Sequence, residues 1–133
     1  MKTVKAHIEQ GKDGSFGIYT EHGDLPFLVI GDGKTLSQAK DDFKAVWESS
    51  MQSYTERTGK TIEATYTYVY DTPSFLQAYK GFITLSGLSK LTGINKAQLS
   101  HYMTGTRRPT TATHNRIKNY VFEFAKGLEQ AFD

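Results

Sequence analysis

The stretch GINKAQLSHYMTGTRRPT, Gly93–Thr110, decides how the C-terminal half of this chain folds. Asn95 is a favoured capping residue, so the stretch predicts a helix from Lys96 to about Thr104. Helical spacing places the following residues on its buried side: Leu99 and either Tyr102 or Met103. Two arginines and a proline come soon after the helix, and the stretch contains no acidic residue.

A second short helix is predicted just before this one. It holds Leu85, Leu88 and Leu91 at helical spacing. The residues available to cap it are Thr84 and Ser86. Gly93 can adopt the positive φ that a tight turn between the two helices needs. Two short helices joined by a glycine turn form a helix-turn-helix, a unit that lays its second helix in the major groove of DNA.

The exposed side of the predicted second helix carries groups suited to DNA. We expect it to contact DNA through Asn95, Lys96, Ala97, Gln98, Ser100 and His101, with Arg107 and Arg108 on the phosphate backbone. Between Asp71 and Glu123 the chain has 51 residues without a carboxylate, and seven of them are Lys or Arg. An idle surface normally mixes both signs of charge, so this span favours an anionic partner. The alternative is a solvated basic face that binds nothing.

The tail of the chain, residues 111–133, is predicted to be helical and to complete a domain over residues 72–133 that starts with a helix at Pro73. Apolar residues recur along the tail at three- and four-residue spacing. Those expected to form a dimer contact are Ile117, Tyr120, Val121, Phe124 and Leu128. The stripe can close the domain's own core, but it is longer than one small unit requires. We therefore expect a homodimer or a dimer of dimers, whose two-fold symmetry would match a palindromic operator.

Residues 1–70 are predicted to form a separate domain with the order β-β-β-α-β. The expected strands are 3–9, 15–20, 27–30 and 61–70. Gly31-Asp32-Gly33 is expected to end the third strand. Thr35 and Gln38 have the spacing of a capping box for the helix that follows, and Gly59 should end that helix. The predicted class is α+β, with one sheet backed by one helix and then an all-α domain.

The composition excludes several classes of protein. The chain has 133 residues and no cysteine, which excludes a disulfide framework and thiolate metal sites. It has no apolar N-terminal segment and no apolar run of about 18 residues, so we expect a soluble cytoplasmic protein that does not bind membranes. Asp13, Asp24 and Asp32 sit in predicted turns, where aspartate is common for local hydrogen bonding alone. We therefore predict no catalytic residue, no metal and no cofactor.

The charges of the two halves differ in sign. Residues 1–73 carry 8 Lys and Arg against 11 Asp and Glu, a net charge of −3. Residues 74–133 carry 8 Lys and Arg against 3 Asp and Glu, a net charge of +5. This split predicts two modules with different partners. An acidic first module suits a basic protein, and a basic second module suits nucleic acid.

Two resemblances sharpen this interpretation. LSKLTGINKAQLSHYMTGTRRPT, Leu88–Thr110, resembles the helix-turn-helix of phage repressors, including the Gly-Thr-Arg-Arg-Pro after the second helix. Nearly the whole chain resembles the HicB antitoxins. The N-terminal segments that carry this second resemblance are GKDGSFGIYTEHGDLP (11–26), Gly31-Asp32-Gly33 and TLSQAKDDF (35–43).

The resemblance to HicB implies a division of labour between the modules. It implies a partial RNase H-like fold without nuclease activity for residues 1–70, which would block a HicA-like, RNA-cleaving toxin. It implies that residues 72–133 bind the promoter of the shared operon. We expect the surface that faces the toxin to include Phe16, Tyr19, Glu21 and Asp24.

Two other functions stay open at this stage. One is a transcription regulator whose N-terminal domain senses a small ligand. The other is an RNase H-like nuclease, which is disfavoured because the acids form no recognisable cluster. A short basic reading frame beside the gene would favour the antitoxin over the ligand-sensing regulator.

Overall fold

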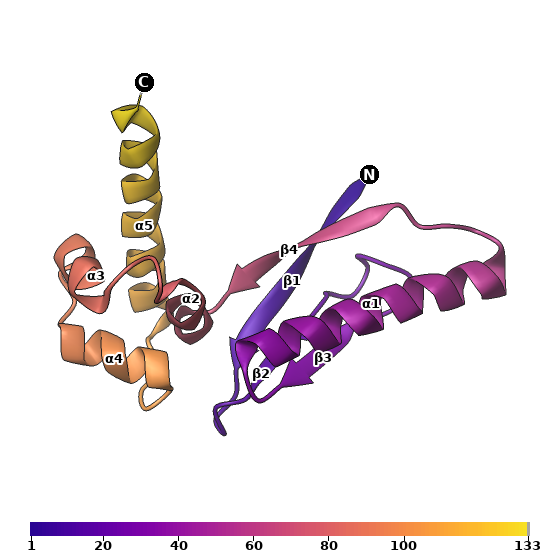
Figure 1. The fold of residues 1–133 in the computed structure, drawn as a ribbon, viewed down its shortest axis with the longest axis horizontal. Helices are drawn as coiled ribbons and strands as arrows, with labels where there is room; N and C mark the ends of the chain where they lie inside the picture. The colour runs from indigo at the N-terminus through magenta and orange to yellow at the C-terminus, as the bar shows by residue number, and fades with distance from the viewer. Residues whose placement is uncertain (133) are drawn as a thin grey trace. The chain divides into compact units, whose positions relative to one another are not determined.

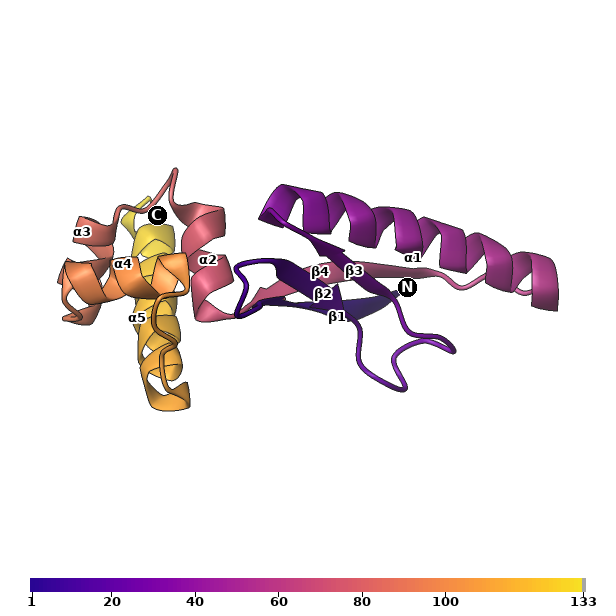
Figure 2. The same ribbon diagram turned by 90° about the horizontal axis from the view of Figure 1, so that it is seen from below.

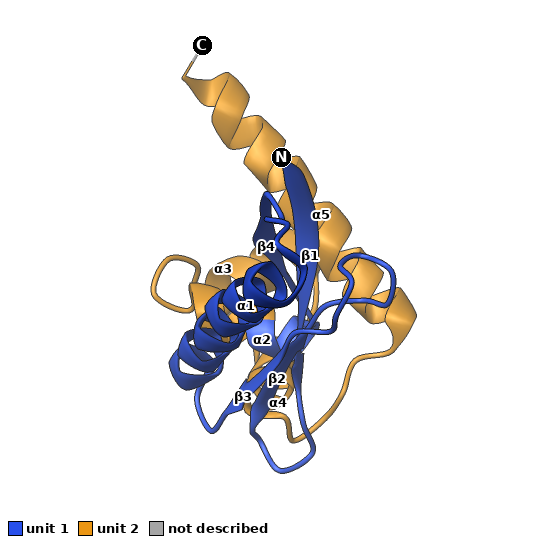
Figure 3. Ribbon diagram, turned by 90° about the vertical axis from the view of Figure 1, so that its right-hand side faces the viewer, with its two compact units in different colours: residues 1–74 blue, residues 75–133 orange. Residues whose placement is uncertain are grey.

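The computed structural model describes residues 1–132 and confirms the α+β class. The chain divides into two compact units, unit 1 (Met1–Ser74) and unit 2 (Phe75–Asp133), coloured in Figure 3. Asp133, the last residue of the predicted second domain, lies outside the described residues. The elements are β1 (Lys2–Gln10), β2 (Phe16–Tyr19), β3 (Ile30–Gly33), α1 (Leu36–Thr58), β4 (Ala64–Tyr70), α2 (Thr72–Tyr79), α3 (Leu85–Thr92), α4 (Lys96–Thr104) and α5 (Thr111–Ala131).

Unit 1 is a mixed sheet with one long helix on one face (Figures 1 and 2). Along the chain its elements follow the order β-β-β-α-β, whereas across the sheet the strand order is β3-β2-β1-β4. β2 is antiparallel to both of its neighbours, and β1 and β4 are parallel. The helix α1 connects β3 to β4, the two edge strands, and so crosses the sheet.

The predicted boundaries of α1 are confirmed by its caps. The Thr35 hydroxyl accepts a hydrogen bond from the Gln38 amide at 3.1 Å, and the Gln38 side chain accepts one from the Thr35 amide at 3.3 Å. At the other end, Gly59 has a φ of 73°, a left-handed conformation that favours glycine. Facing the sheet, α1 buries Ala39, Phe43 and Trp47 among the apolar residues of β1 and β2.

The prediction for the third strand is wrong. The strand is Ile30–Gly33, so the Gly-Asp-Gly segment that was expected to end a strand is the strand itself. The reason is the close approach of α1. A Cβ on Gly31 would lie 2.5 Å from the backbone N of Phe43, and a Cβ on Gly33 would lie 2.5 Å from that of Ala39. Only glycine lets the helix backbone lie this close to the strand.

The last strand begins at Ala64, three residues later than predicted. Its tyrosines, Tyr66, Tyr68 and Tyr70, point to the α1 side of the sheet and are half-buried. The Lys40 ammonium lies 4.6 Å from the centre of the Tyr68 ring and donates a hydrogen bond of 2.8 Å to the Tyr70 hydroxyl. Burial, with the neighbouring tyrosines, raises the pKa of Tyr68 to about 12. This row therefore packs as part of the sheet's inner face.

Unit 2 is helical and has its own small core. The buried residues are Leu76, Leu88, Ile94, Leu99, Tyr102 and Ile117. After Val121 every described residue of α5 is exposed, and the C-terminal part of this helix extends clear of α3 and α4 (Figure 1). Among residues 1–132, no helix has the length and apolar content that a membrane crossing requires.

Candidate nucleic-acid interface

The turn between α3 and α4 fixes the two helices as one unit. Gly93 has a φ of 73° and its amide donates a hydrogen bond of 2.8 Å to the Ser89 carbonyl, which ends α3. The buried Thr92 hydroxyl donates to the Leu88 carbonyl at 2.7 Å and accepts from the Ile94 amide at 3.2 Å. Ile94 is 9% exposed and anchors the turn in the core. The predicted positive φ at Gly93 is confirmed.

The start and the buried side of α4 are also as predicted. The Asn95 side chain accepts a hydrogen bond of 2.7 Å from the Ala97 amide, and the helix runs over Lys96–Thr104. Leu99 is fully buried, at 0% exposure. Of the two residues predicted to join it on the buried side, Tyr102 is the one that is buried, at 6% exposure. These contacts hold α4 with a defined face outward.

Solvent exposure varies along the outward face of α4. Asn95, Lys96 and Ala97 are exposed. The three further residues predicted to contact DNA are half-buried, namely Gln98, Ser100 and His101. The Gln98 amide nitrogen donates a hydrogen bond of 3.0 Å to the Tyr102 hydroxyl, which orients the Gln98 side chain along the helix. The first turn of α4 is therefore its most accessible part.

The two arginines follow α4 in an exposed loop. The amide of Arg107 donates a hydrogen bond of 3.2 Å to the His101 carbonyl, so the loop is tied to the last turn of the helix. Arg107 and Arg108 are both exposed. No Asp or Glu lies within residues 72–122, so no carboxylate of unit 2 between α2 and the middle of α5 opposes this positive charge.

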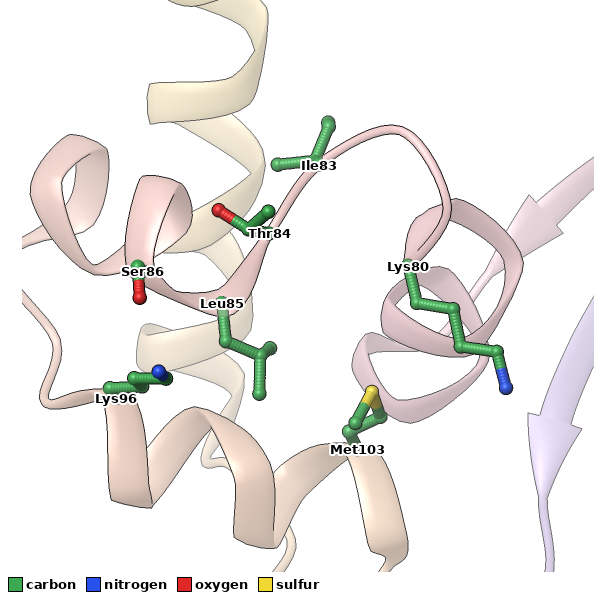
Figure 4. Close-up of a pocket in the computed structure, with 7 residues that line it drawn as sticks. All are labelled: Lys80, Ile83, Thr84, Leu85, Ser86, Lys96 and Met103. Atoms are coloured by element: carbon green, nitrogen blue, oxygen red, sulfur yellow. The ribbon is translucent and has the colours of Figure 1, made fainter.

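Sequence reasoning missed the neighbours of Lys96. A pocket of about 530 Å³ lies in unit 2, and Thr84 and Ser86 from the start of α3 share its lining with Lys96 (Figure 4). The apolar residues of its lining are Ile83, Leu85 and Met103. The sequence indicates Thr84 and Ser86 only as capping residues, and Thr84 does cap α3. Because they are about ten residues from Lys96 in sequence, only tertiary packing brings them beside it.

The residues predicted for a dimer contact separate into two groups. Ile117 is 3% exposed and belongs to the core of unit 2, and Val121 packs partly against that core. Tyr120, Phe124 and Leu128 are 40%, 38% and 50% exposed. The first turns of α5 therefore complete the unit, and the later turns present an uncovered apolar stripe.

The residues predicted to face a toxin do not lie on one surface of unit 1. Phe16 is 6% exposed and lies in the core under α1, so its assignment to a surface is corrected. Tyr19 points to the opposite face, where its hydroxyl donates a hydrogen bond of 2.8 Å to Glu9. This bond, with partial burial, raises the pKa of Tyr19 above its usual value. Glu21 is exposed beside them, and Asp24 caps the following loop by accepting from the Glu21 amide.

A pocket of about 260 Å³ lies on unit 1 between α1 and Phe27. It falls below the roughly 300–1,000 Å³ that is usual for small-molecule sites. Across residues 1–132, no three His, Asp or Glu side chains converge in a way that would hold a metal ion. No protein-family model, no curated protein and no solved structure matches this chain.

Proposed function

We propose that this protein is a DNA-binding repressor and antitoxin, in which unit 2 binds operator DNA and unit 1 binds a basic, RNA-cleaving toxin of the HicA kind. The observation that carries the DNA-binding part is the α3–α4 pair. Its turn is held by Gly93, its second helix is exposed at the first turn, and no carboxylate of residues 72–122 lies near it. This is the arrangement that a helix-turn-helix needs to enter the major groove.

The contacts of the proposed complex divide by type. Lys96, with Thr84 and Ser86 beside it, would meet phosphates, and Arg107 and Arg108 would meet the backbone beyond the other end of α4. Gln98 and His101 would reach base edges, where amide and imidazole groups can donate and accept hydrogen bonds. We also propose that unit 1 has a partial RNase H-like fold. It is supported by the mixed sheet, the parallel β1–β4 pair and the single covering helix.

The DNA-binding proposal is tested by removing the arginine pair. We expect Arg107→Ala with Arg108→Ala to weaken binding to DNA from upstream of the gene by about tenfold, because two phosphate contacts are lost. The slope of log affinity against log salt should become shallower by about two units. Fluorescence anisotropy over a series of salt concentrations measures both quantities.

The matched control is Lys126→Ala, which removes a positive charge from the exposed part of α5. It should leave the slope within about half a unit of the wild type because it touches no phosphate. An arginine double variant whose slope equals that of the wild type would contradict the assignment of Arg107 and Arg108 to the phosphate backbone. Absence of DNA binding by the wild-type protein at low salt would contradict the repressor itself.

The proposal also includes a homodimer formed through α5. Tyr120, Phe124, Leu128 and Phe132 recur every four residues along α5 and are exposed at 40%, 38%, 50% and 92%. Such a row of large apolar groups on a helix that its own unit leaves uncovered is typical of an association surface. Glycine weakens a helix interior, and Gly127 lies inside α5. A Cβ on Gly127 would meet nothing within 4 Å, so packing within this chain gives no reason for glycine at this position. Close approach of a second α5 supplies one.

We expect Phe124→Ala with Leu128→Ala to raise the dimer dissociation constant about 100-fold, because two central apolar anchors are removed. Sedimentation equilibrium measures the change. Phe122→Ala is the control, since this residue lies on the opposite side of α5 with the Lys118 ammonium 5.7 Å from its ring centre. If the wild-type protein is monomeric at 100-micromolar concentration, the α5 dimer is wrong.

The toxin-binding part rests on the negative charge of residues 1–73 and is separable from the DNA-binding part. A short basic reading frame beside the gene, whose product copurifies with residues 1–74, would support it. Copurification with residues 75–133 alone would reverse the assignment of the two units.

A further inference from the structure

The face of the sheet away from α1 carries no helix within unit 1 (Figure 2). On this face the strand register aligns one residue from each strand in a row, namely Val69, His7, Tyr19 and Ile30. The His7 and Tyr19 rings are stacked, with centroids 5.4 Å apart. Ile30 is 59% exposed and Val69 is 38% exposed. The row is therefore a mixed apolar and aromatic band that crosses the whole sheet.

Next to this band lies an open position flanked by two acidic residues, which we call the hollow. In the register, Gly17 of β2 stands between Glu9 of β1 and Asp32 of β3. Neighbouring strands are about 4.8 Å apart, so the two acidic residues are separated by about 10 Å across the glycine. Gly17 has no side chain to fill the space, and a Cβ built on it would meet nothing within 4 Å.

No contact inside the described chain explains why residue 17 is a glycine. Its φ is not among the positive values of the described glycines, so its backbone does not require glycine. Gly31 and Gly33 admit the backbone of α1, but nothing approaches Gly17. A glycine in the interior of a strand weakens it and often marks a place where a ligand comes close. The unfilled space over Gly17 fits that role.

The two carboxylates of the hollow lack a cation. Within residues 1–132, neither Glu9 nor Asp32 is paired with a Lys, Arg or His side chain. Glu9 accepts one hydrogen bond, from Tyr19, which holds it at the edge of the hollow. Glu21 adds a third acid beside the band, 2.9 Å from His7 Nε2. A second copy of this face would bring carboxylates against carboxylates, and nucleic acid would be repelled.

We propose that the hollow over Gly17, between Glu9 and Asp32, receives an arginine side chain from a basic protein partner. A guanidinium presents donors in a plane, so it can bond a carboxylate with two parallel hydrogen bonds and stack on the neighbouring Tyr19 ring. The band of Val69, His7, Tyr19 and Ile30 covers the apolar surface around that arginine. This inference rests on the proposed function for the identity of the partner, a basic toxin, and assigns the surface and the residue type that it uses.

The test is a titration of the full-length protein with a tetra-arginine peptide, followed by amide NMR. We expect the largest shifts at Glu9, Gly17 and Asp32. Gly17→Val places a side chain over residue 17, where an added Cβ would meet nothing within 4 Å, and should weaken peptide binding about tenfold, which corresponds to loss of a charge-assisted contact. Glu9→Gln with Asp32→Asn should do the same, and Thr65→Val, on the same face in the far strand, should change nothing.

Gly17→Val must keep the wild-type amide spectrum away from β2 for the result to count as loss of the site. Equal affinity for wild type and Gly17→Val, or shifts spread over every acidic residue, would overturn the proposal. The titration contains neither DNA nor toxin. Missing shifts at Gly17 in a protein that still binds DNA would therefore refute this site alone, and loss of DNA binding with intact shifts would refute only the repressor.

Discussion

Gly31→Ala is expected to destabilise unit 1 by about 3 kcal/mol, at the upper end of the usual cost of overpacking a core. The new Cβ would lie 2.5 Å from the backbone N of Phe43 and 2.6 Å from its Cα. No side-chain rotation can relieve a clash with backbone, so α1 must move away from β3. That movement opens the layer in which Phe43 is fully buried.

The chain contains one tryptophan, Trp47, which lies on α1 with 8% exposure and reports on unit 1 alone. Urea unfolding followed by its fluorescence should show a lower midpoint for Gly31→Ala. Gly17→Ala is the matched control, because it places the same methyl group on the adjacent strand where nothing lies within 4 Å. Equal midpoints for the two variants would mean that α1 does not lie as close to β3 as described.

The contrast between Gly31 and Gly17 shows which structural roles cannot be predicted from local sequence. Caps act over three or four residues, so the Thr35–Gln38 box and the left-handed Gly59 and Gly93 were predictable from local sequence. The role of Gly31 depends on a helix residue twelve positions later, and local reasoning treated it as a stop signal. An apolar run before it, at 27–30, made the wrong strand attractive.

The candidate sites divide in the same way. Helical spacing predicted Leu99 on the buried side of α4 and Lys96 on its exposed side, and both predictions agree with the structure. The corrected position of Phe16 needed only the alternation of a strand, since Phe16 and Tyr19 are three residues apart and must face opposite sides. The Glu9–Gly17–Asp32 hollow depends on register across three strands. Sequence periodicity gives the face of each residue but not its cross-strand neighbour.

The same small core that positions α4 makes unit 2 sensitive to a single deletion. Leu99 is 0% exposed and is one of six buried residues that form this core, together with Leu88 of α3 and Ile94 of the turn. Leu99→Ala is expected to cost about 3 kcal/mol, because it removes buried methyl groups and leaves a cavity between α3 and α4. A unit of about 60 residues has a total stability of only about 3–9 kcal/mol.

Leu99→Ala should therefore unfold much of unit 2 and abolish the proposed DNA binding, although Leu99 is buried and is not part of the proposed DNA-binding face. Far-UV circular dichroism should show lost helix at 37 °C, while Trp47 fluorescence keeps its wild-type urea midpoint. Phe82→Ala is the control in the same unit, since Phe82 is 85% exposed and its loss leaves no cavity. A Leu99→Ala protein that keeps wild-type helix content and DNA affinity would show that α4 is not held by this core, and the proposed DNA-binding face would lose its support.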